Sequence, residues 1–311
     1  MTLPVFPRHD DAWMRERLQP PTGRPRVVID TDAANEIDDQ FAIAWALQST
    51  DRLELLGLYA EPFSFAHRRS DHPEAPADAM PFNPPAVGME RSYREAVKVY
   101  ELLGLSPAGR VFRGSAGYLP GPGQPLHSEA VDHLIATARE HAPGGAPLYV
   151  LALGCVTNIA SALLLAPDIT ERIVVVWTSG YPSHAPQVND SFNLEQDMVA
   201  SRWLLDSGVP HVYLPGFHVG AQLRLCGPHC GGHVVHPGFH GQAPCFDRSS
   251  IVMCATVHRR RARNRYRSRR EDHPLGDVAG PDESPAPAVP LECVDRACHA
   301  SSNRHDNPDA A

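Results

Sequence analysis

Five acidic side chains occupy ten consecutive residues, DTDAANEIDD, between Asp30 and Asp39. The stretch follows an apolar run typical of a strand and precedes an apolar run typical of a helix. Carboxylates held close together repel one another, so such a cluster needs a positive charge or shared protons. Oxygen ligands of this kind suit a hard divalent cation, Ca²⁺ or Mg²⁺. The pattern therefore predicts a metal site at the end of a strand.

Helix capping is the alternative explanation for part of the cluster. Asn35 precedes Asp38 by three residues, as an N-cap would, and acidic residues near a helix start are favoured by its dipole. Capping accounts for one or two carboxylates, but not for Asp30 or Asp32, which lie before the turn. We therefore favour the metal interpretation.

The elements that would position this cluster alternate between strand and helix. Apolar runs of strand length occupy residues 27–30, 55–60, 148–153, 173–178 and 212–214, and helical patterns occupy 38–48, 89–103, 128–141, 157–166 and 195–207. Ser128 stands at the N-cap position of its helix. Such alternation predicts a doubly wound α/β fold, with a mainly parallel sheet and helices on both faces. Ligands of these folds bind at the carboxyl ends of strands, where the acidic stretch lies.

Two further segments bring polar groups to the same predicted edge. The segment LYVLALGCVTNIASALLL predicts a strand, a turn and a helix, and carries Thr157 and Asn158. The segment NDSFNLEQDMVASRWLL follows the 173–178 strand and carries Asn189 and Asn193. Any one of these could be a helix cap. Three such turns on one edge favour a binding site. The connection at 61–88, which holds many prolines, suggests a lid over that edge.

Charge and hydropathy exclude several classes of partner. The net charge of −8 and the pI near 6.1 argue against nucleic acid or an anionic membrane as a partner. We find no signal-peptide pattern and no apolar stretch long enough to span a bilayer. These features predict a cytoplasmic location.

The chain divides by composition into residues 1–25, an N-terminal extension, 26–225, an α/β domain, and 226–311, an atypical tail. The tail holds only two leucines but six of the seven cysteines. Three interpretations compete: a frameshifted, disordered tail, a zinc site around Cys226, Cys230, His233 and His236, or a nucleic-acid arm at residues 259–270. We favour the first, because the tail lacks the apolar content of a packed module.

The ordered motifs DTDAANEIDD, CVTNIA and SFNLEQD resemble those of the nucleoside hydrolase family, the inosine- and uridine-preferring N-ribohydrolases. The resemblance covers about residues 26–225 and does not extend into the tail. It implies a hydrolase that uses one Ca²⁺ per chain to cleave the N-glycosidic bond of ribonucleosides, releasing ribose and a free base. It also implies a nucleoside as the small-molecule partner, and homo-oligomers such as dimers or tetramers.

The resemblance also implies roles for individual residues. Asp32 matches the aspartate that ligates Ca²⁺ and acts as the general base on water. Asp39 matches a second calcium ligand, Asp30 supports the metal from nearby, and the Thr157 carbonyl matches another ligand. Ribose binding is implied for Asp38, Asn193 and Asn189.

Several positions depart from the family pattern. Five residues separate the two aspartate pairs instead of three, and Ser191 stands where a glutamate is common. An asparagine usual after the second strand is absent, and Glu61 is a candidate substitute. The family's last third supplies a further aspartate ligand and a histidine for the leaving base. We assign neither Asp277 nor His305–Asp306 to these roles, because no periodic pattern presents them.

Two other functions remain open from the sequence. A non-catalytic nucleoside- or ribose-binding homologue would keep the sugar site without turnover. A phosphatase of the haloacid dehalogenase type would use Asp30 as nucleophile and Asp32 as acid. That chemistry wants a cation beside the nucleophile, and Lys98, the only lysine, lies on an amphipathic helix.

Overall fold

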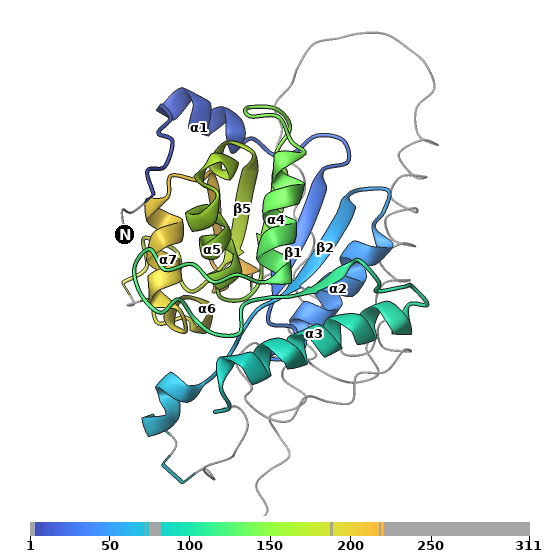
Figure 1. The fold of residues 1–311 in the computed structure, drawn as a ribbon, viewed down its shortest axis with the longest axis vertical. Helices are drawn as coiled ribbons and strands as arrows, with labels where there is room; N and C mark the ends of the chain where they lie inside the picture. The colour runs from blue at the N-terminus through green and yellow to red at the C-terminus, as the bar shows by residue number, and fades with distance from the viewer. Residues whose placement is uncertain (1–3, 72, 75–81, 187–188, 218, 221–311) are drawn as a thin grey trace, which may run out of the picture. The chain divides into compact units, whose positions relative to one another are not determined.

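The computed structural model describes residues 4–71, 73–74, 82–186, 189–217 and 219–220. Its centre is a parallel sheet of six strands in the order β3-β2-β1-β4-β5-β6 (Figure 1). The strands are β1 Arg26–Thr31, β2 Glu54–Ala60, β3 Val111–Arg113, β4 Leu148–Ala152, β5 Ile173–Thr178 and β6 His211–Leu214. The order reverses between β1 and β4, and such a reversal places a crevice at the carboxyl ends of these two strands.

The helices are α1 Asp11–Arg17, α2 Asp38–Gln48, α3 Pro85–Leu102, α4 Glu129–Arg139, α5 Thr157–Leu165, α6 Phe192–Glu195 and α7 Met198–Asp206, with 3₁₀ turns η1 Ala66–Asp71 and η2 Pro167–Glu171. Helices α4, α5 and α7 share one apolar cluster with strand residues such as Val28, Val150 and Val175. Helices α2 and α3 pack with Ile29 and Leu58, which alternate to the opposite face. The doubly wound α/β prediction is confirmed.

Three details of the predicted elements are wrong. The helix predicted at 195–207 begins later, at Met198, because Asp197 caps it by accepting a hydrogen bond from the Ala200 amide, and Glu195 ends the separate helix α6. Asn35 does not cap α2, which begins without a side-chain cap. Helix α3 begins four residues before the predicted start, with a proline in its first turn.

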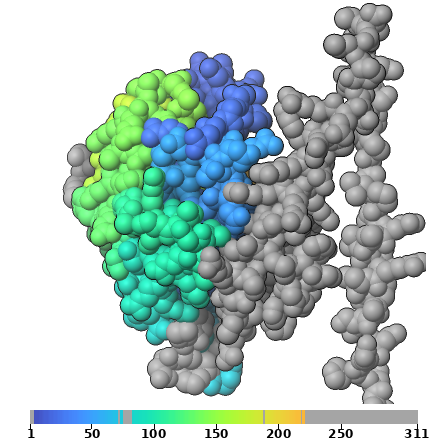
Figure 2. Space-filling view, turned by 90° about the vertical axis from the view of Figure 1, so that its right-hand side faces the viewer, coloured from blue at the N-terminus to red at the C-terminus, as the bar shows by residue number. Residues whose placement is uncertain are grey.

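The short elements α1 and β3 were not predicted. Helix α1 is capped by Asp10, and its last residue, Arg17, is buried and donates hydrogen bonds to the Gly145 and Glu171 carbonyls. Figure 2 shows the dark-blue N-terminal residues beside green residues from the middle of the chain. The predicted N-terminal extension therefore packs on the α/β domain. Arg17 bonds to backbone carbonyls, which every residue type has, so the sequence does not reveal these contacts.

One face of the sheet has an area over β4, β5 and β6 on which no described helix supplies apolar packing. Val27, Tyr149 and Val174 form a small cluster with partly buried neighbours on β4, β5 and β6. In the described part of the chain, the cluster's apolar partners outside the sheet are Leu18 and Leu53, neither of them within a helix. An apolar pocket of about 380 Å³ lies here. Parallel sheets are normally covered on both faces.

The tail predictions lie outside the described residues: the frameshift, zinc and nucleic-acid interpretations of 226–311, and the unassigned Asp277 and His305–Asp306. The second part of the predicted lid, at 72 and 75–81, also lies outside them. In the first part, residues 61–65 are buried, and the lid stays a prediction. A side chain at Gly88 would collide with the Phe63 carbonyl, so this stretch lies tightly against α3. No helix among the described residues is long and apolar enough to cross a membrane.

The buried ring of His211 predicts a loss of stability in mild acid. Burial lowers the pKa of His211 to about 4, and its Nε2 atom is buried without a partner in the described chain. The unfolded chain binds this proton near pH 6.5, so stability is full above that pH and falls as the pH drops towards 4. We expect His211→Phe to lose less free energy of unfolding between pH 7 and pH 5 than the parent chain, measured in urea.

Exposed His184 provides the control for this test. His184→Phe should keep the parent pH dependence. An equal acid loss in the parent and in His211→Phe would contradict the account.

Candidate active site

Asp32 and Asp39 meet at the carboxyl end of β1. Both are buried, with exposed fractions of 3% and 8%, and their carboxyl groups lie close enough for each to affect the pKa of the other. The Thr31 hydroxyl donates to Asp39 Oδ2 at 2.6 Å, and the Asn35 amide donates to Asp32 Oδ2 at 3.2 Å. The chain therefore brings one aspartate of each pair, Asp32 and Asp39, together despite the five-residue spacing between the pairs.

Burial and mutual repulsion make this pair hard to ionise. Burial raises the pKa of Asp32 to about 7, and the negative charge of Glu36 adds to the shift. Burial also raises the pKa of Asp39 well above its usual range, with further contributions from Asp38 and Asp32. In the described chain, no Arg or Lys pairs with either carboxylate. A bound cation would relieve this repulsion.

A second buried acid pair lies behind the first. Asp30 is fully buried and lies close enough to Glu61, which follows β2, for each carboxyl group to affect the pKa of the other. The Asn158 amide donates to Asp30 Oδ1 at 3.0 Å, and the Cys155 thiol donates to Glu61 Oε2 at 3.1 Å. Burial raises the pKa of Asp30 to about 6 and that of Glu61 well above its usual range. A proton shared between the two carboxyl groups would satisfy both.

The turn between β4 and α5 forms the wall next to Asp32. A Cβ atom at Gly154 would lie 2.9 Å from Asp32 Oδ1, so glycine lets the carboxylate approach the backbone. Thr157 begins α5, and its hydroxyl donates to Asp197 Oδ2 at 2.7 Å. Asp197 Oδ2 also accepts from the Leu119 amide at 2.9 Å. Asp197 thus links the start of α7 to the turn between β4 and α5 and to the connection between β3 and α4.

The two predicted ribose asparagines have backbone and side-chain partners. Asn193 Nδ2 donates to the Leu153 and Thr178 carbonyls, at 2.7 and 3.0 Å, which lie at the ends of β4 and β5. Asn189 Nδ2 donates to the Tyr213 hydroxyl at 3.0 Å. Asn189 Oδ1 accepts from the Ser191 amide at 3.4 Å. These contacts place Asn193 beside the β4–α5 turn, whereas Asn189 reaches towards β6.

The structure thus brings together Asp30, Asp32, Asp39, Thr157 and Asn158, and it leaves Asp38 exposed at the first turn of α2. Their catalytic, metal-binding and ribose-binding roles stay predictions. Sequence reasoning missed Asp197 and Cys155 as site-forming residues. The only signal for Asp197 was its place at the end of SFNLEQD, directly before a helical pattern.

The donor set fits a hard cation in part. Asp32 and Asp39 provide two adjoining carboxylates, but the described residues contain no group of three or more His, Cys, Asp or Glu side chains placed to hold a metal ion. Ca²⁺ usually takes six to eight oxygen ligands. Carbonyls, water or substrate hydroxyls would have to complete the set around this pair.

Removing the Asp197 carboxylate should destabilise the fold. Asp197→Ala leaves the Leu119 and Ala200 amides and the Thr157 hydroxyl without their acceptor, inside a site where Asp197 is 3% exposed. We expect a loss of about 3 kcal/mol in the free energy of unfolding, measured in urea. Asp206→Ala, at the exposed end of α7, is the control and should change stability by less than about 0.5 kcal/mol. A small loss for Asp197→Ala would show that water replaces the carboxylate.

One family model and several solved structures match this chain. The family model described as inosine-uridine preferring nucleoside hydrolase matches residues 27–229. A purine-preferring ribonucleoside hydrolase from Gardnerella vaginalis is 23% identical, with a TM-score of 0.48 over 66% of this chain and 65% of its own. An inosine-uridine preferring enzyme from Bacillus anthracis is 19% identical, with a TM-score of 0.42 over 67% and 69% of the two chains. The type III effector XopQ, solved with adenosine diphosphate ribose, is 17% identical, with a TM-score of 0.49 over 84% and 74%.

No curated protein sequence matches the chain. This chain spans about two thirds, 65%, of the length of the Gardnerella vaginalis enzyme. The family model covers well over half of the 311 residues, including all three motifs and every residue of the two acid pairs. The chain therefore belongs to the inosine-uridine preferring nucleoside hydrolase family.

Proposed function

We propose that this chain hydrolyses the N-glycosidic bond of ribonucleosides in a Ca²⁺-dependent reaction. The observation that carries the proposal is the buried Asp32–Asp39 pair, which lies where the strand order reverses in a member of this family. Two acidic groups without a cationic side chain suit both a metal and a sugar that becomes positively charged. A nucleoside is the expected partner, and homo-oligomerisation, a role in salvage and a cytoplasmic location remain expectations.

Ca²⁺, when bound, would supply Lewis acidity towards a water molecule and a fixed positive charge. The residues that would hold it are Asp32 and Asp39, with the Thr157 carbonyl and Asp30 as further candidates. Asp39 is held in place by the Thr31 hydroxyl, and Asp32 lies against Gly154. Such rigid support keeps the carboxylates fixed while the charge on the substrate changes.

Asp32 would take a proton from the attacking water. Its carboxylate lies beside the residues that would hold the metal, where it can accept a proton from a bound water. As the bond from C1′ to the base nitrogen breaks, positive charge develops on the ribose. The carboxylates around the sugar would stabilise that charge, as paired carboxylates do in inverting glycosidases. Asp38, Asn193 and Asn189 are the proposed contacts to ribose hydroxyls.

A binding protein without turnover is the second candidate function. It is favoured by the absence, among the described residues, of a third acidic side chain placed to complete a metal site. Calorimetric binding of ribose or inosine without release of base would support this candidate over the first. The phosphatase alternative has no such support, because no Arg or Lys among the described residues pairs with Asp30.

Substitution of Asp32 tests the catalytic role directly. We expect Asp32→Asn to lower the rate of inosine or uridine hydrolysis by about 10²–10⁴-fold, because the amide cannot accept the water's proton. Release of free base is the measurement, with and without a chelator. Asp132→Asn, on the exposed face of α4, is the matched control and should keep the parent rate. Hydrolysis that persists in the chelator would reject the Ca²⁺ role.

A methyl group at Gly154 should disturb the same carboxylate. The added Cβ would lie 2.9 Å from Asp32 Oδ1 and 3.0 Å from its Cγ, so the carboxyl group must move. We expect Gly154→Ala to lower nucleoside turnover by about tenfold or more, because small displacements of catalytic groups are costly. Gly117→Ala adds a methyl group with nothing within 4 Å and should leave turnover unchanged. Equal rates in both variants would argue that the position of Asp32 is not critical.

A further inference from the structure

The apolar pocket of about 380 Å³ lies on the sheet face over β4, β5 and β6. Alternate residues of a strand point to the same face, so β4 and β5 each contribute two side chains to its floor. Two rows of residues paired in register form this floor: Val27, Tyr149 and Val174, then Leu151, Val176 and Val212. None of the described residues that line the pocket belongs to the two acid pairs. The pocket is therefore separate from the candidate active site.

The segment after α1 forms one wall of the pocket. It contributes Leu18 and three prolines, Pro20, Pro21 and Pro25, and Leu53 also lines the pocket. Proline has a fixed φ and no amide hydrogen, so this wall is stiff and offers few hydrogen-bond donors. The pocket volume lies within the range of small-molecule sites, which are concave and mainly apolar. Its walls therefore suit a slender apolar group.

Arg17 brings a buried charge to this pocket. It is 7% exposed and lines the pocket near the points where β4 and β5 begin. Its Nη1 atom donates to the Gly145 carbonyl, and its Nη2 atom donates to the Glu171 carbonyl at 3.2 Å. Its Cζ atom lies 5.5 Å from the centroid of the Trp13 ring. The Nε atom is buried and has no hydrogen-bond partner among the described residues.

The guanidinium of Arg17 thus lacks one acceptor. Both of its bonded partners are neutral carbonyls, and burial lowers the pKa of Arg17, because the charged form loses hydration. Burial raises the pKa of Tyr149, and the Arg17 charge opposes that shift, so the phenol lies at the same end of the pocket. A buried N–H without an acceptor costs free energy, and a negatively charged acceptor recovers the most. This end of the pocket therefore favours an anion.

We propose that this pocket binds a free amphiphilic carboxylate, with its head group at Arg17 and its alkyl chain along the sheet face. A carboxylate carries one negative charge, which matches one guanidinium, whereas a phosphate would bring almost two. The alkyl chain runs from the row of Tyr149 and Val174 towards the row of Leu151 and Val176. This binding goes beyond nucleoside hydrolysis and does not depend on it.

A second copy of this chain is the other candidate for the same face. An apolar sheet surface suits a partner protein as well as an alkyl chain. However, Arg17 is 7% exposed, so the broad surface of another protein would cover the rim of the pocket without reaching the buried Nε atom. A slender ligand contacts both the apolar floor and the buried donor. The small molecule is therefore the better match.

Calorimetry with three probes tests the proposal. Octanoate should bind at one molecule per chain. Octan-1-ol has the same chain length without the charge and should bind about tenfold more weakly, because it lacks the ionic hydrogen bond to Arg17. Butyrate keeps the charge but has four fewer methylene groups, and it should bind at least about tenfold more weakly than octanoate. Absence of saturable octanoate binding, or equal affinity for octanoate and octan-1-ol, would overturn the proposal.

Two variants test the head group and the chain separately. Arg17→Met should lower octanoate affinity by about tenfold and leave octan-1-ol affinity within about threefold, because it removes the charged donor. Val212→Phe fills part of the floor and should weaken both ligands by about tenfold, and it keeps the Arg17 contacts should Arg17→Met fail to fold. Leu205→Phe, at a position 57% exposed on α7, is the matched control and should change neither affinity. Equal octanoate affinity in Val212→Phe and in the parent would place the ligand elsewhere and overturn the proposal.

Light scattering separates the two candidate occupants. We expect octanoate to bind without changing the mass of the parent protein. A mass that rises with protein concentration, together with an octanoate affinity that falls over the same range, would show that a second copy occupies the face and would overturn the proposal. Neither calorimetry nor light scattering reads nucleoside turnover, so their outcome is independent of the proposed function.

Discussion

Repulsion among buried carboxylates is the constraint on which this site depends. Asp30, Asp32, Asp39 and Glu61 are all less than 9% exposed at one edge of the sheet. Their ionised forms can coexist only with shared protons, hydrogen-bond donors or a cation. The protein supplies the donors through the Thr31 hydroxyl and the Asn158 amide. The described chain places no Arg or Lys beside Asp32 or Asp39. A divalent cation would therefore suit this site.

The sheet explains how so much unfavourable charge is held in place. Asp30 pairs in register with Tyr59 on β2 and Ala152 on β4, so its backbone cannot move away from the cluster. Helix α5 begins at Thr157 and is buried along its length, which fixes Asn158 under Asp30. The apolar packing between α5 and the sheet thus opposes the electrostatic cost. The stability of the core thus offsets the cost of holding these carboxyl groups together.

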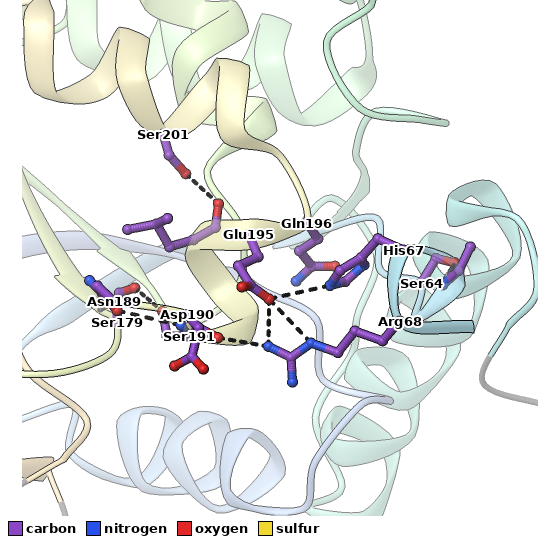
Figure 3. Close-up of polar contacts among 12 residues, drawn as sticks. Ser64, His67, Arg68, Ser179, Asn189, Asp190, Ser191, Glu195, Gln196 and Ser201 are labelled. Carbon is purple, nitrogen blue, oxygen red and sulfur yellow. Dashed lines mark hydrogen bonds and ion pairs between the residues drawn. The ribbon is translucent and has the colours of Figure 1, made fainter. Parts of the chain in front are cut away.

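Much of this arrangement follows from patterns that are local in sequence. The α2 bounds, the Ser128 cap of α4 and five of the strands are predictable, because apolar runs and capping residues act over a few positions. The three-residue β3 is too short to carry a period. Contacts such as Asp30 with Glu61, or Thr157 with Asp197, depend on which strands are neighbours, and a single sequence does not contain that information. The ion pair between Arg68 and Glu195 (Figure 3) likewise joins segments that are distant in sequence and cannot be predicted from it.

The two faces of the sheet differ in how completely the described residues cover them. Helices α4, α5 and α7 pack on one face, against residues of β1, β4 and β5. The opposite face over β4–β6 has only Leu18 and Leu53 as apolar cover outside the sheet, within the described residues. Residues 226–311, with two leucines, offer little material to cover it.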